Sequence, residues 1–367
     1  MSGKSEILAA LLVSALCLCI PALPGAADDY DFIPLRKLSL QRDSVTLRFI
    51  GDVMLHKGQI DRDFTSFLKG ISEDLAEADV AFANMEFSLG GRPYTGYPAF
   101  SSPDSYAEYV VGCGVDVLLT ANNHILDRGL TGLARTLGIY GNMERMQLAS
   151  YCGTGLDAES YSRHNPLCFR VKGIKIAVVN CTYGTNVKAV GEYPKVTLLE
   201  EAAGLVSQAR EEGADFVIAL PHWGPEYKTV CSGSQREAAR KLAESGADII
   251  IGSHPHVVQN RETIDLGDRQ VPVFYSLGNA VSNMSAENTR IELMLTLKLV
   301  RETDGSVSML EPQWDWLWCS LPGRLTDNYA TIRIEDYRDR RELWMNPRDY
   351  DLMISSLERV REATGLY

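Results

Sequence analysis

The segment GADIIIGSHPHVVQ, residues 246–259, places two of the six histidines of the chain one residue apart, directly after three consecutive isoleucines. A short apolar run after a glycine is typical of a buried strand. If the chain stays extended through His254 and His256, both imidazoles project from one face, because side chains alternate along a strand. Two adjacent neutral imidazoles favour a shared cation, although ordinary loop polarity would give the same pair.

The same order of helix, glycine, apolar strand and histidine occurs three times. The expected helices cover residues 102–112, 198–212 and 234–245, and the strands that follow end at His124, His222 and His254. A glycine after the last helical turn is a common C-cap, whereas the serine and proline at 102 and 103 predict the start of the first helix. Strands that alternate with helices predict a largely parallel sheet.

Other segments add antiparallel strands and make the expected sheet mixed. VTLRFI (45–50) and VAFANMEF (80–87) are expected strands, and the apolar spacing over 60–79 predicts an amphipathic helix between them. The dipeptide Lys172-Gly173 predicts a two-residue hairpin turn that pairs Val171 with Ile174.

One domain is expected over residues 44–300, because no low-complexity linker interrupts the pattern. Residues 301–367 are expected to form a C-terminal extension that packs on the same domain. Its alternating aromatic residues in WDWLWC predict a half-buried strand, and residues 350–363 predict a closing amphipathic helix.

The composition limits the classes of function. The chain has 367 residues, of which 45% are hydrophobic and 23% charged, so it can bury a full core. A formal net charge of −12 excludes nucleic acid as a partner, because nothing balances a phosphate backbone. An acidic protein can still bind an anionic substrate if a metal supplies local positive charge. The motifs of serine hydrolases (GxSxG) and of P-loop NTPases are absent from the sequence.

The first 27 residues predict an exported protein. Lys4, a 14-residue apolar run over 7–20 and the segment GAA before Asp28 are typical of a cleaved signal peptide, residues 1–27, and an uncleaved membrane anchor is the alternative. Six cysteines follow Ala27, and an even number in an exported chain is compatible with disulfides. The hairpin register keeps Cys168 and Cys181 too far apart to form one.

Polar residues stand where the expected strands end. They are Asp52, Glu86, Asn123, His124, His222, His254 and His256. Each has an ordinary explanation by itself, such as a turn or a satisfied polar cap. In open α/β sheets, however, side chains at the carboxyl ends of several strands converge on one ligand site. Two carboxylates, an amide and several imidazoles form a nitrogen and oxygen ligand set that suits Zn, Mn, Fe or Ni.

An ordered set of motifs resembles the poly-γ-glutamate capsule synthesis protein CapA family, a branch of the calcineurin-like metallophosphoesterases. The motifs are GDVML, NME, ANNHILDRG, PHWGPEY, GADIIIGSHPHVVQ and YSLGN, between Val45 and Asn279. The resemblance implies an α/β fold, the metallophosphoesterase-like four-layer sandwich with two mixed β-sheets flanked by helices.

The resemblance also implies roles for individual residues. Glu86 would bridge two divalent metal ions; Asp52 and His256 would complete one position, and Asn123, His222 and His254 the other. His124 would act as the general acid, oriented by Asp127. Met54 stands where related phosphoesterases usually have a histidine ligand, so one metal position is expected to be weak or absent. His56 is a less favoured substitute for the missing ligand.

The expected function is that of an exported, metal-dependent, phosphoesterase-like protein in capsule or exopolymer biosynthesis of the poly-γ-glutamate type. One or two divalent ions (Mn, Zn, Fe or Ni) would activate water. The expected partners are an anionic polymer or phosphoester substrate and a membrane synthase or export complex. A non-catalytic, metal-stabilised assembly or polymer-binding component is the alternative. Attack on a carbonyl carbon in place of phosphorus also stays open.

Overall fold

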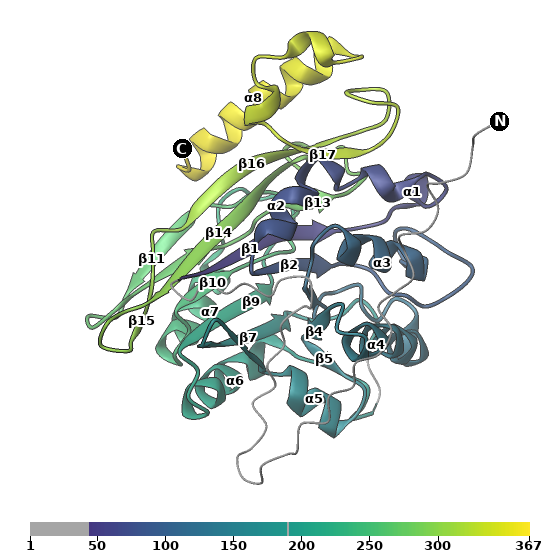
Figure 1. Cartoon of the computed structure of the whole chain (residues 1–367). Helices are drawn as coiled ribbons and strands as arrows, with labels where there is room; N and C mark the ends of the chain where they lie inside the picture. The colour runs from purple at the N-terminus through teal and green to yellow at the C-terminus, as the bar shows by residue number, and fades with distance from the viewer. Residues whose placement is uncertain (1–43, 189–190) are drawn as a thin grey trace, which may run out of the picture.

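Two mixed β-sheets pack face to face in the computed structural model, which describes residues 44–188 and 191–367 (Figure 1). The expected signal peptide, residues 1–27, lies outside the described residues. Among the helices of the described part of the chain, none combines the length and the hydropathy that a membrane crossing requires.

The larger sheet contains nine strands. They are β1 (Ser44–Val53), β2 (Val80–Met85), β3 (Val117–Leu119), β4 (Ser150–Cys152), β13 (Asn279–Val281), β14 (Ile291–Arg301), β15 (Val307–Met309), β16 (Gln313–Ser320) and β17 (Ala330–Arg333). β1 to β4 run parallel to one another, whereas β14, β16 and β17 extend the other side of β1 in antiparallel pairs. This sheet is therefore mixed, as expected.

The second sheet contains six strands. They are β6 (Leu167–Val171), β7 (Ile174–Thr182), β9 (Phe216–His222), β10 (Ile249–Ile251), β11 (Arg261–Asp265) and β12 (Gln270–Phe274). β7, β9, β10 and β12 are parallel, and β6 and β11 are antiparallel edge strands. The predicted hairpin is confirmed, since Val171 pairs with Ile174. A separate two-stranded sheet joins β5 (Thr154–Gly155) to β8 (Lys195–Val196).

Helices cover the outer faces of both sheets, which gives four layers (Figure 1). The larger sheet packs against α2 (Ser72–Glu77), α3 (Asp104–Gly112) and α4 (Gly129–Arg145), and the smaller sheet packs against α6 (Leu199–Glu211) and α7 (Gly233–Glu244). α5 (Ala158–His164) follows β5. A third apolar cluster fills the space between the sheets, where Phe49 stacks on Phe82 with ring centroids 4.5 Å apart. The predicted four-layer sandwich is confirmed.

The C-terminal segment extends the apolar cluster that lies between the sheets. α8 (Pro347–Thr364) packs against β14, and its buried residues Met353 and Leu357 join Trp316 and Trp318 of β16. The helix ends at Gly365, whose φ of +71° is the left-handed conformation that glycine adopts without strain. The amphipathic helix expected over 350–363 is thus confirmed and begins one turn earlier.

The prediction of a continuous helix over 60–79 is wrong. The segment forms four short pieces instead, α1 (Lys57–Ile60), two 3-10 turns (Phe64–Ser66 and Lys69–Ile71) and α2. The Asp63 carboxylate accepts the Thr65 backbone N–H, which competes with helical hydrogen bonding. The Leu68 N–H is likewise diverted, because it donates to the Tyr109 hydroxyl. The apolar residues still reach the core, because each short turn places one of them inward.

Two smaller expectations concern caps and cysteines. Ser102 is not the N-cap of α3, which begins at Asp104 after Pro103. All six cysteines of the described residues carry free thiols, and Cys168 and Cys181 do not bridge, as the hairpin register predicted.

Candidate metal centre

The centre lies where the carboxyl ends of strands from both sheets meet. Asp52 is fully buried within β1 and pairs in register with Asn84 of β2 and Asn279 of β13, so it does not close a turn. A Cβ atom at Gly51 would lie 2.0 Å from the carbonyl oxygen of Gly278, which explains the glycine before Asp52. Strand pairing on both sides therefore fixes the position of the carboxylate.

The HPH segment is bent, which corrects the expectation of an extended chain. β10 ends at Ile251, and His254 and His256 adopt φ values of +97° and +59°. Such backbone conformations cost non-glycine residues on the order of 1–3 kcal/mol each, and they cluster at functional sites. The two imidazoles nevertheless come together, with ring centroids 5.8 Å apart. The turn, rather than strand alternation, brings them to the same side.

Glu86 is the shared member of two groups of possible ligands. Its carboxylate belongs to one group with His254 and His256 and to another with Asp52 and His222, and in each group the ligand atoms lie within 4.8 Å of one another. The Nε2 atoms of His222 and His256 are 3.7 and 3.8 Å from Oε1 of Glu86. The two groups divide the ligands differently from the two positions that the resemblance implies. The assignment of each residue to one ion or the other therefore stays a prediction.

A cation fits the environment of Glu86. The side chain is fully buried, and neither carboxylate oxygen accepts a hydrogen bond from any residue that the structure describes. Burial raises the pKa of Glu86 well above its usual value, and the negative charges of Asp52 and Glu226 raise it further. The Nδ1 atom of His254 is likewise buried without a hydrogen-bond partner in the described chain. Buried groups of this kind are normally satisfied, so these atoms are suited to bind a divalent ion.

His256 is oriented by its neighbours. Its Nδ1 atom lies 2.9 Å from Oδ1 of Asn279 and 3.2 Å from Oδ2 of Asp52, and both oxygens accept hydrogen bonds. These contacts favour the tautomer with the proton on Nδ1 and leave the Nε2 lone pair on the side of Glu86. Burial lowers the pKa of His256, but hydrogen bonding and charge from Asp52 outweigh it, so the pKa is raised.

His222 connects the two sheets at the centre. Its Nε2 atom is 2.9 Å from Oδ1 of Asn123, and its Nδ1 atom lies 3.0 Å from the Ser253 hydroxyl and 3.2 Å from Nδ2 of Asn84. Burial lowers the pKa of His222 well below its usual value, and the neighbouring histidines lower it further. Burial also lowers the pKa of His254, to about 3. Both imidazoles are therefore neutral at pH 7, as metal ligation requires.

His124 and Asp127 form a pair beside the ligand groups. Nδ1 of His124 lies 2.7 Å from Oδ2 of Asp127, which also accepts the backbone N–H of Phe100 at 2.7 Å. The Phe100 ring packs edge-on against the imidazole, with centroids 4.7 Å apart. The ring of His124 is thus held in one orientation by contacts that leave Nε2 for a substrate, which is the arrangement that a proton donor needs.

Met54 and His56 do not join the ligand groups. Met54 is buried in the apolar cluster on the outer face of the larger sheet. Nδ1 of His56 contacts Oε1 of Gln59 at 3.3 Å and accepts the backbone N–H of Asn283 at 3.2 Å. Burial lowers the pKa of His56 to about 4. Neither residue is in a group that could hold a metal ion among the described residues.

Sequence reasoning missed several amides and a hydroxyl that support the ligands. Nδ2 of Asn84 donates to Oδ1 of Asp52 at 2.7 Å, and Oδ1 of Asn84 accepts from Nδ2 of Asn122. Asn84 is a polar residue inside the otherwise apolar run of β2, and that break in the pattern is the signal that could have identified it. Ser253, which contacts His222, carries no comparable signal.

Three tyrosines surround the centre on its solvent side. The ring of Tyr183 lies 4.8 Å from His254, that of Tyr227 lies 6.2 Å from His256, and that of Tyr97 lies 6.4 Å from His124. These residues are between 46% and 73% exposed, so their rings are accessible to a bound molecule. We name these three residues the tyrosine rim.

The pKa of Glu292 depends on its burial and on the charge of Asp52, so Glu292 can be used to test the electrostatic interactions near Asp52. It is fully buried, its Oε1 atom accepts the Gly51 N–H at 2.6 Å, and burial together with the charge of Asp52 raises its pKa well above 4.5. The folded state therefore keeps a proton that the unfolded chain releases, so this contribution to stability is lost as pH rises through the raised pKa.

We expect Glu292→Gln to remove this loss of stability at higher pH. Thermal unfolding with chelator present, from pH 5 to 9, should show the variant gaining in Tm relative to the parent as pH rises. Parallel curves for the two proteins would contradict a raised pKa. The exposed Glu237→Gln serves as the control.

Two mixed sheets with flanking helices form a metallophosphoesterase-like α/β fold, and buried groups of possible metal ligands lie at its strand ends. A family model, "Bacterial capsule synthesis protein PGA_cap", matches residues 46–284. The chain belongs to this bacterial capsule synthesis family.

Two curated relatives agree with this assignment. The chain is 27% identical over 267 residues to "Capsule biosynthesis protein CapA" of Bacillus anthracis, covering 68% of this chain and 62% of the relative. It is 33% identical over 193 residues to "PGA biosynthesis protein CapA" of Bacillus subtilis (strain 168), covering 52% of this chain and 48% of the relative. The aligned region thus spans about half to three fifths of each relative.

Among solved structures, the NAD nucleotidase NadN of Haemophilus influenzae superposes with a TM-score of 0.47 at 13% identity, covering 87% of this chain and 68% of that one. A hypothetical protein of Thermus thermophilus gives a TM-score of 0.45 at 15% identity, covering 74% of this chain and 99% of that one.

Proposed function

We propose that this chain is an exported, metal-dependent, phosphoesterase-like protein that acts in the biosynthesis of a capsule or a related exopolymer. The observation that carries the proposal is the buried carboxylate of Glu86, which has no hydrogen-bond donor among the described residues and is shared by two groups of ligand atoms. The family assignment supports the role in capsule synthesis, and an anionic polymer or a phosphoester is the substrate that we infer.

Asp52, Glu86, Asn123, His222, His254 and His256 would hold one or two divalent ions, with Mn, Zn, Fe or Ni compatible with the ligand set. A bound divalent ion would supply a Lewis acid and lower the pKa of water to near neutral pH. His256 is kept in a ligating tautomer by Asn279 and Asp52. His124, oriented by Asp127, would donate a proton to the leaving oxygen from Nε2.

The acidic groups around Glu86 predict how an anionic substrate is bound. Glu226 and Asp127 add negative charge near Glu86, and both raise its pKa. Without cations this acidic centre would repel an anion, so the metal ions must provide the attraction. The tyrosine rim offers aromatic surface beside the reacting group. Chelation should therefore weaken substrate binding as well as turnover.

Met54 favours a second candidate function. An apolar side chain occupies the position at which a histidine ligand is usual among related phosphoesterases, and it is packed in the core. A centre that holds one ion firmly and the other weakly would suit a non-catalytic, metal-stabilised component of a membrane-associated polymer export complex. This alternative makes the metal a structural element and the tyrosine rim a polymer contact.

Measurements of metal content and of phosphodiester hydrolysis distinguish the catalytic function from the non-catalytic one. We expect the purified chain to contain about one or two divalent ions, and to hydrolyse a generic phosphodiester. His254→Ala and Asn123→Ala should lose both metal and activity, whereas the exposed Asn142→Ala should keep both. Hydrolysis that persists in metal-free protein would refute the proposal. Metal binding without hydrolysis would support the non-catalytic candidate.

A cellular assay tests the role of the centre in polymer synthesis. In a strain from which the gene is deleted, the parent should restore polymer and Asn123→Ala should not. Rescue by Asn123→Ala would show that the protein contributes to assembly without the metal centre.

A further inference from the structure

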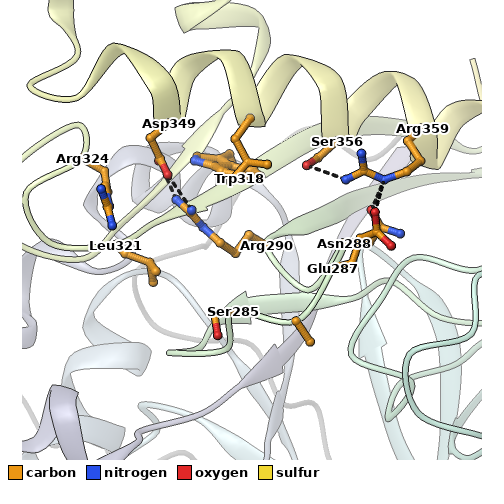
Figure 2. A pocket seen from close by; sticks show the side chains of 12 residues that line it. Ser285, Glu287, Asn288, Arg290, Trp318, Leu321, Arg324, Asp349, Ser356 and Arg359 are labelled. Carbon is orange, nitrogen blue, oxygen red and sulfur yellow. Dashed lines mark hydrogen bonds and ion pairs between the residues drawn. The ribbon is translucent and has the colours of Figure 1, made fainter.

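A cavity of about 440 Å³ separates α8 from the loop 282–290 and the end of β16 (Figure 2). We name it the α8 cavity. It is distinct from the metal centre, because none of the proposed metal ligands lines it. Its walls combine arginines and acids with hydroxyl groups and apolar side chains, so the charge balance determines what it can bind.

Two of the three arginines in the wall are already neutralised. Arg290 makes a bidentate ion pair with Asp349 of α8, with both N–O distances 2.7 Å, and stacks over Trp318 at 4.0 Å. Arg359 lies 3.1 Å from Glu287 and donates to Asn288 and Ser356. Asp349 and Glu287 are the two carboxylates of the wall, and each is therefore already paired with an arginine.

Arg324 is different. No ion pair or side-chain hydrogen bond of its guanidinium is found within the described ranges 44–188 and 191–367. In Figure 2 it lies at one end of the cavity and Arg359 at the other, with the Arg290–Asp349 pair between them. The cavity therefore carries one uncompensated positive charge in a protein whose formal net charge is −12. Such a local charge favours an anion.

The remaining wall indicates the shape of that anion. A guanidinium binds carboxylate and phosphate oxygens through paired hydrogen bonds. Leu321 and Leu352 supply apolar surface, and Ser285 provides a hydroxyl. We propose that the α8 cavity is a second ligand site, which takes a small molecule with a carboxylate or phosphate head on an aliphatic body and pairs the head with Arg324.

The loop 282–290 connects this cavity to the metal centre. One side of the loop lines the cavity, and the Thr289 carbonyl on the loop accepts a hydrogen bond from Nδ2 of Asn279 at 3.0 Å. Oδ1 of the same Asn279 accepts from Nδ1 of His256 at 2.9 Å. Because two hydrogen bonds separate the loop from a proposed metal ligand, occupancy of the cavity should be detectable at His256.

Arg324→Met tests the site with the full chain as purified. Methionine keeps the aliphatic stem and removes the charge, and the hydrogen bond from the Asn346 N–H to the backbone carbonyl of Arg324 is unaffected. Glutarate and inorganic phosphate serve as separate probes in titration calorimetry, so the two kinds of head are distinguished. We expect at least one of them to bind the parent and to bind the variant about tenfold or more weakly, as for loss of a charged hydrogen-bond pair.

Arg340→Met is the matched control, because Arg340 is exposed and does not line the cavity. It should bind both probes like the parent. The His256 ring resonances in NMR spectra should shift when the probe is added to the parent and to Arg340→Met, but not to Arg324→Met. Equal binding by the parent and Arg324→Met, or no binding of either probe at millimolar concentration, would overturn the site. Binding that leaves His256 unshifted would overturn its connection to the metal centre.

Discussion

Glu86→Gln is expected to abolish tight binding of divalent ions while leaving the metal-free protein at least as stable as the parent. Glutamine has nearly the same shape as glutamate but carries no charge, and Glu86 is the one residue shared by both groups of ligand atoms found in the described chain. Its removal therefore weakens every metal position at once. In the metal-free protein, the substitution also removes a destabilising group, because the buried carboxylate of Glu86 has no hydrogen-bond donor among the described residues.

Thermal unfolding with and without metal measures both effects. At a free metal concentration about 100 times Kd, binding stabilises the folded state by about 2.7 kcal/mol, which corresponds to a rise in Tm of roughly 3–4 °C for a chain of this size. The parent should show this rise, and Glu86→Gln should not. Glu237→Gln, on the exposed face of α7, should behave like the parent. A variant that binds metal with parental affinity would remove Glu86 from the site.

The pH dependence gives an independent check of the same residue. Burial, followed by the charges of Asp52 and Glu226, raises the folded-state pKa of Glu86 above the usual value of 4.5. The metal-free parent should therefore lose stability as pH rises from 4.5 through the raised pKa, because the folded carboxyl holds its proton longer than the unfolded one. Glu86→Gln lacks this proton, so its unfolding should show a smaller loss over the same range.

Local patterns in the sequence were sufficient for several strands of both sheets and for the polar residues at their ends. Apolar runs bounded by glycine predicted β9 and β10, and a two-residue turn predicted the register between Val171 and Ile174. These features depend on neighbours in the chain, and such neighbours are visible in the sequence. The convergence of polar residues at the carboxyl ends followed from the general geometry of α/β sheets.

Features that depend on distant contacts could not be predicted in the same way. The helix expected over 60–79 is broken partly because the hydroxyl of Tyr109, 41 residues later, accepts the Leu68 N–H. The positive φ values of His254 and His256 could not be expected from the local sequence, because residues other than glycine rarely adopt them. The contact of Asn84 with His222 joins two sheets, and no spacing within either strand encodes it.

His124→Asn is expected to lower kcat by about 10²- to 10⁴-fold for a phosphodiester with an alkyl leaving group, which is the usual contribution of a general acid. Bound metal should be unchanged, because His124 belongs to neither group of ligand atoms. With p-nitrophenolate as the leaving group, the loss should be much smaller, since this anion departs without a proton. A purely structural role for His124 would lower both rates equally, and only steady-state kinetics with the two substrates separates these cases.

Asp127→Asn extends the test to the residue that orients the ring. An asparagine oxygen can still accept the hydrogen bond from Nδ1 of His124, which spans 2.7 Å in the parent, but it cannot balance a positive charge on the imidazole. We therefore expect a smaller fall in kcat than for His124→Asn, again concentrated on the alkyl leaving group. Adding the Asp127 change to His124→Asn should cost little more, because the carboxylate acts through the imidazole. If the two losses instead multiply independently, Asp127 acts elsewhere, and its contact with the Phe100 N–H is the alternative site of action.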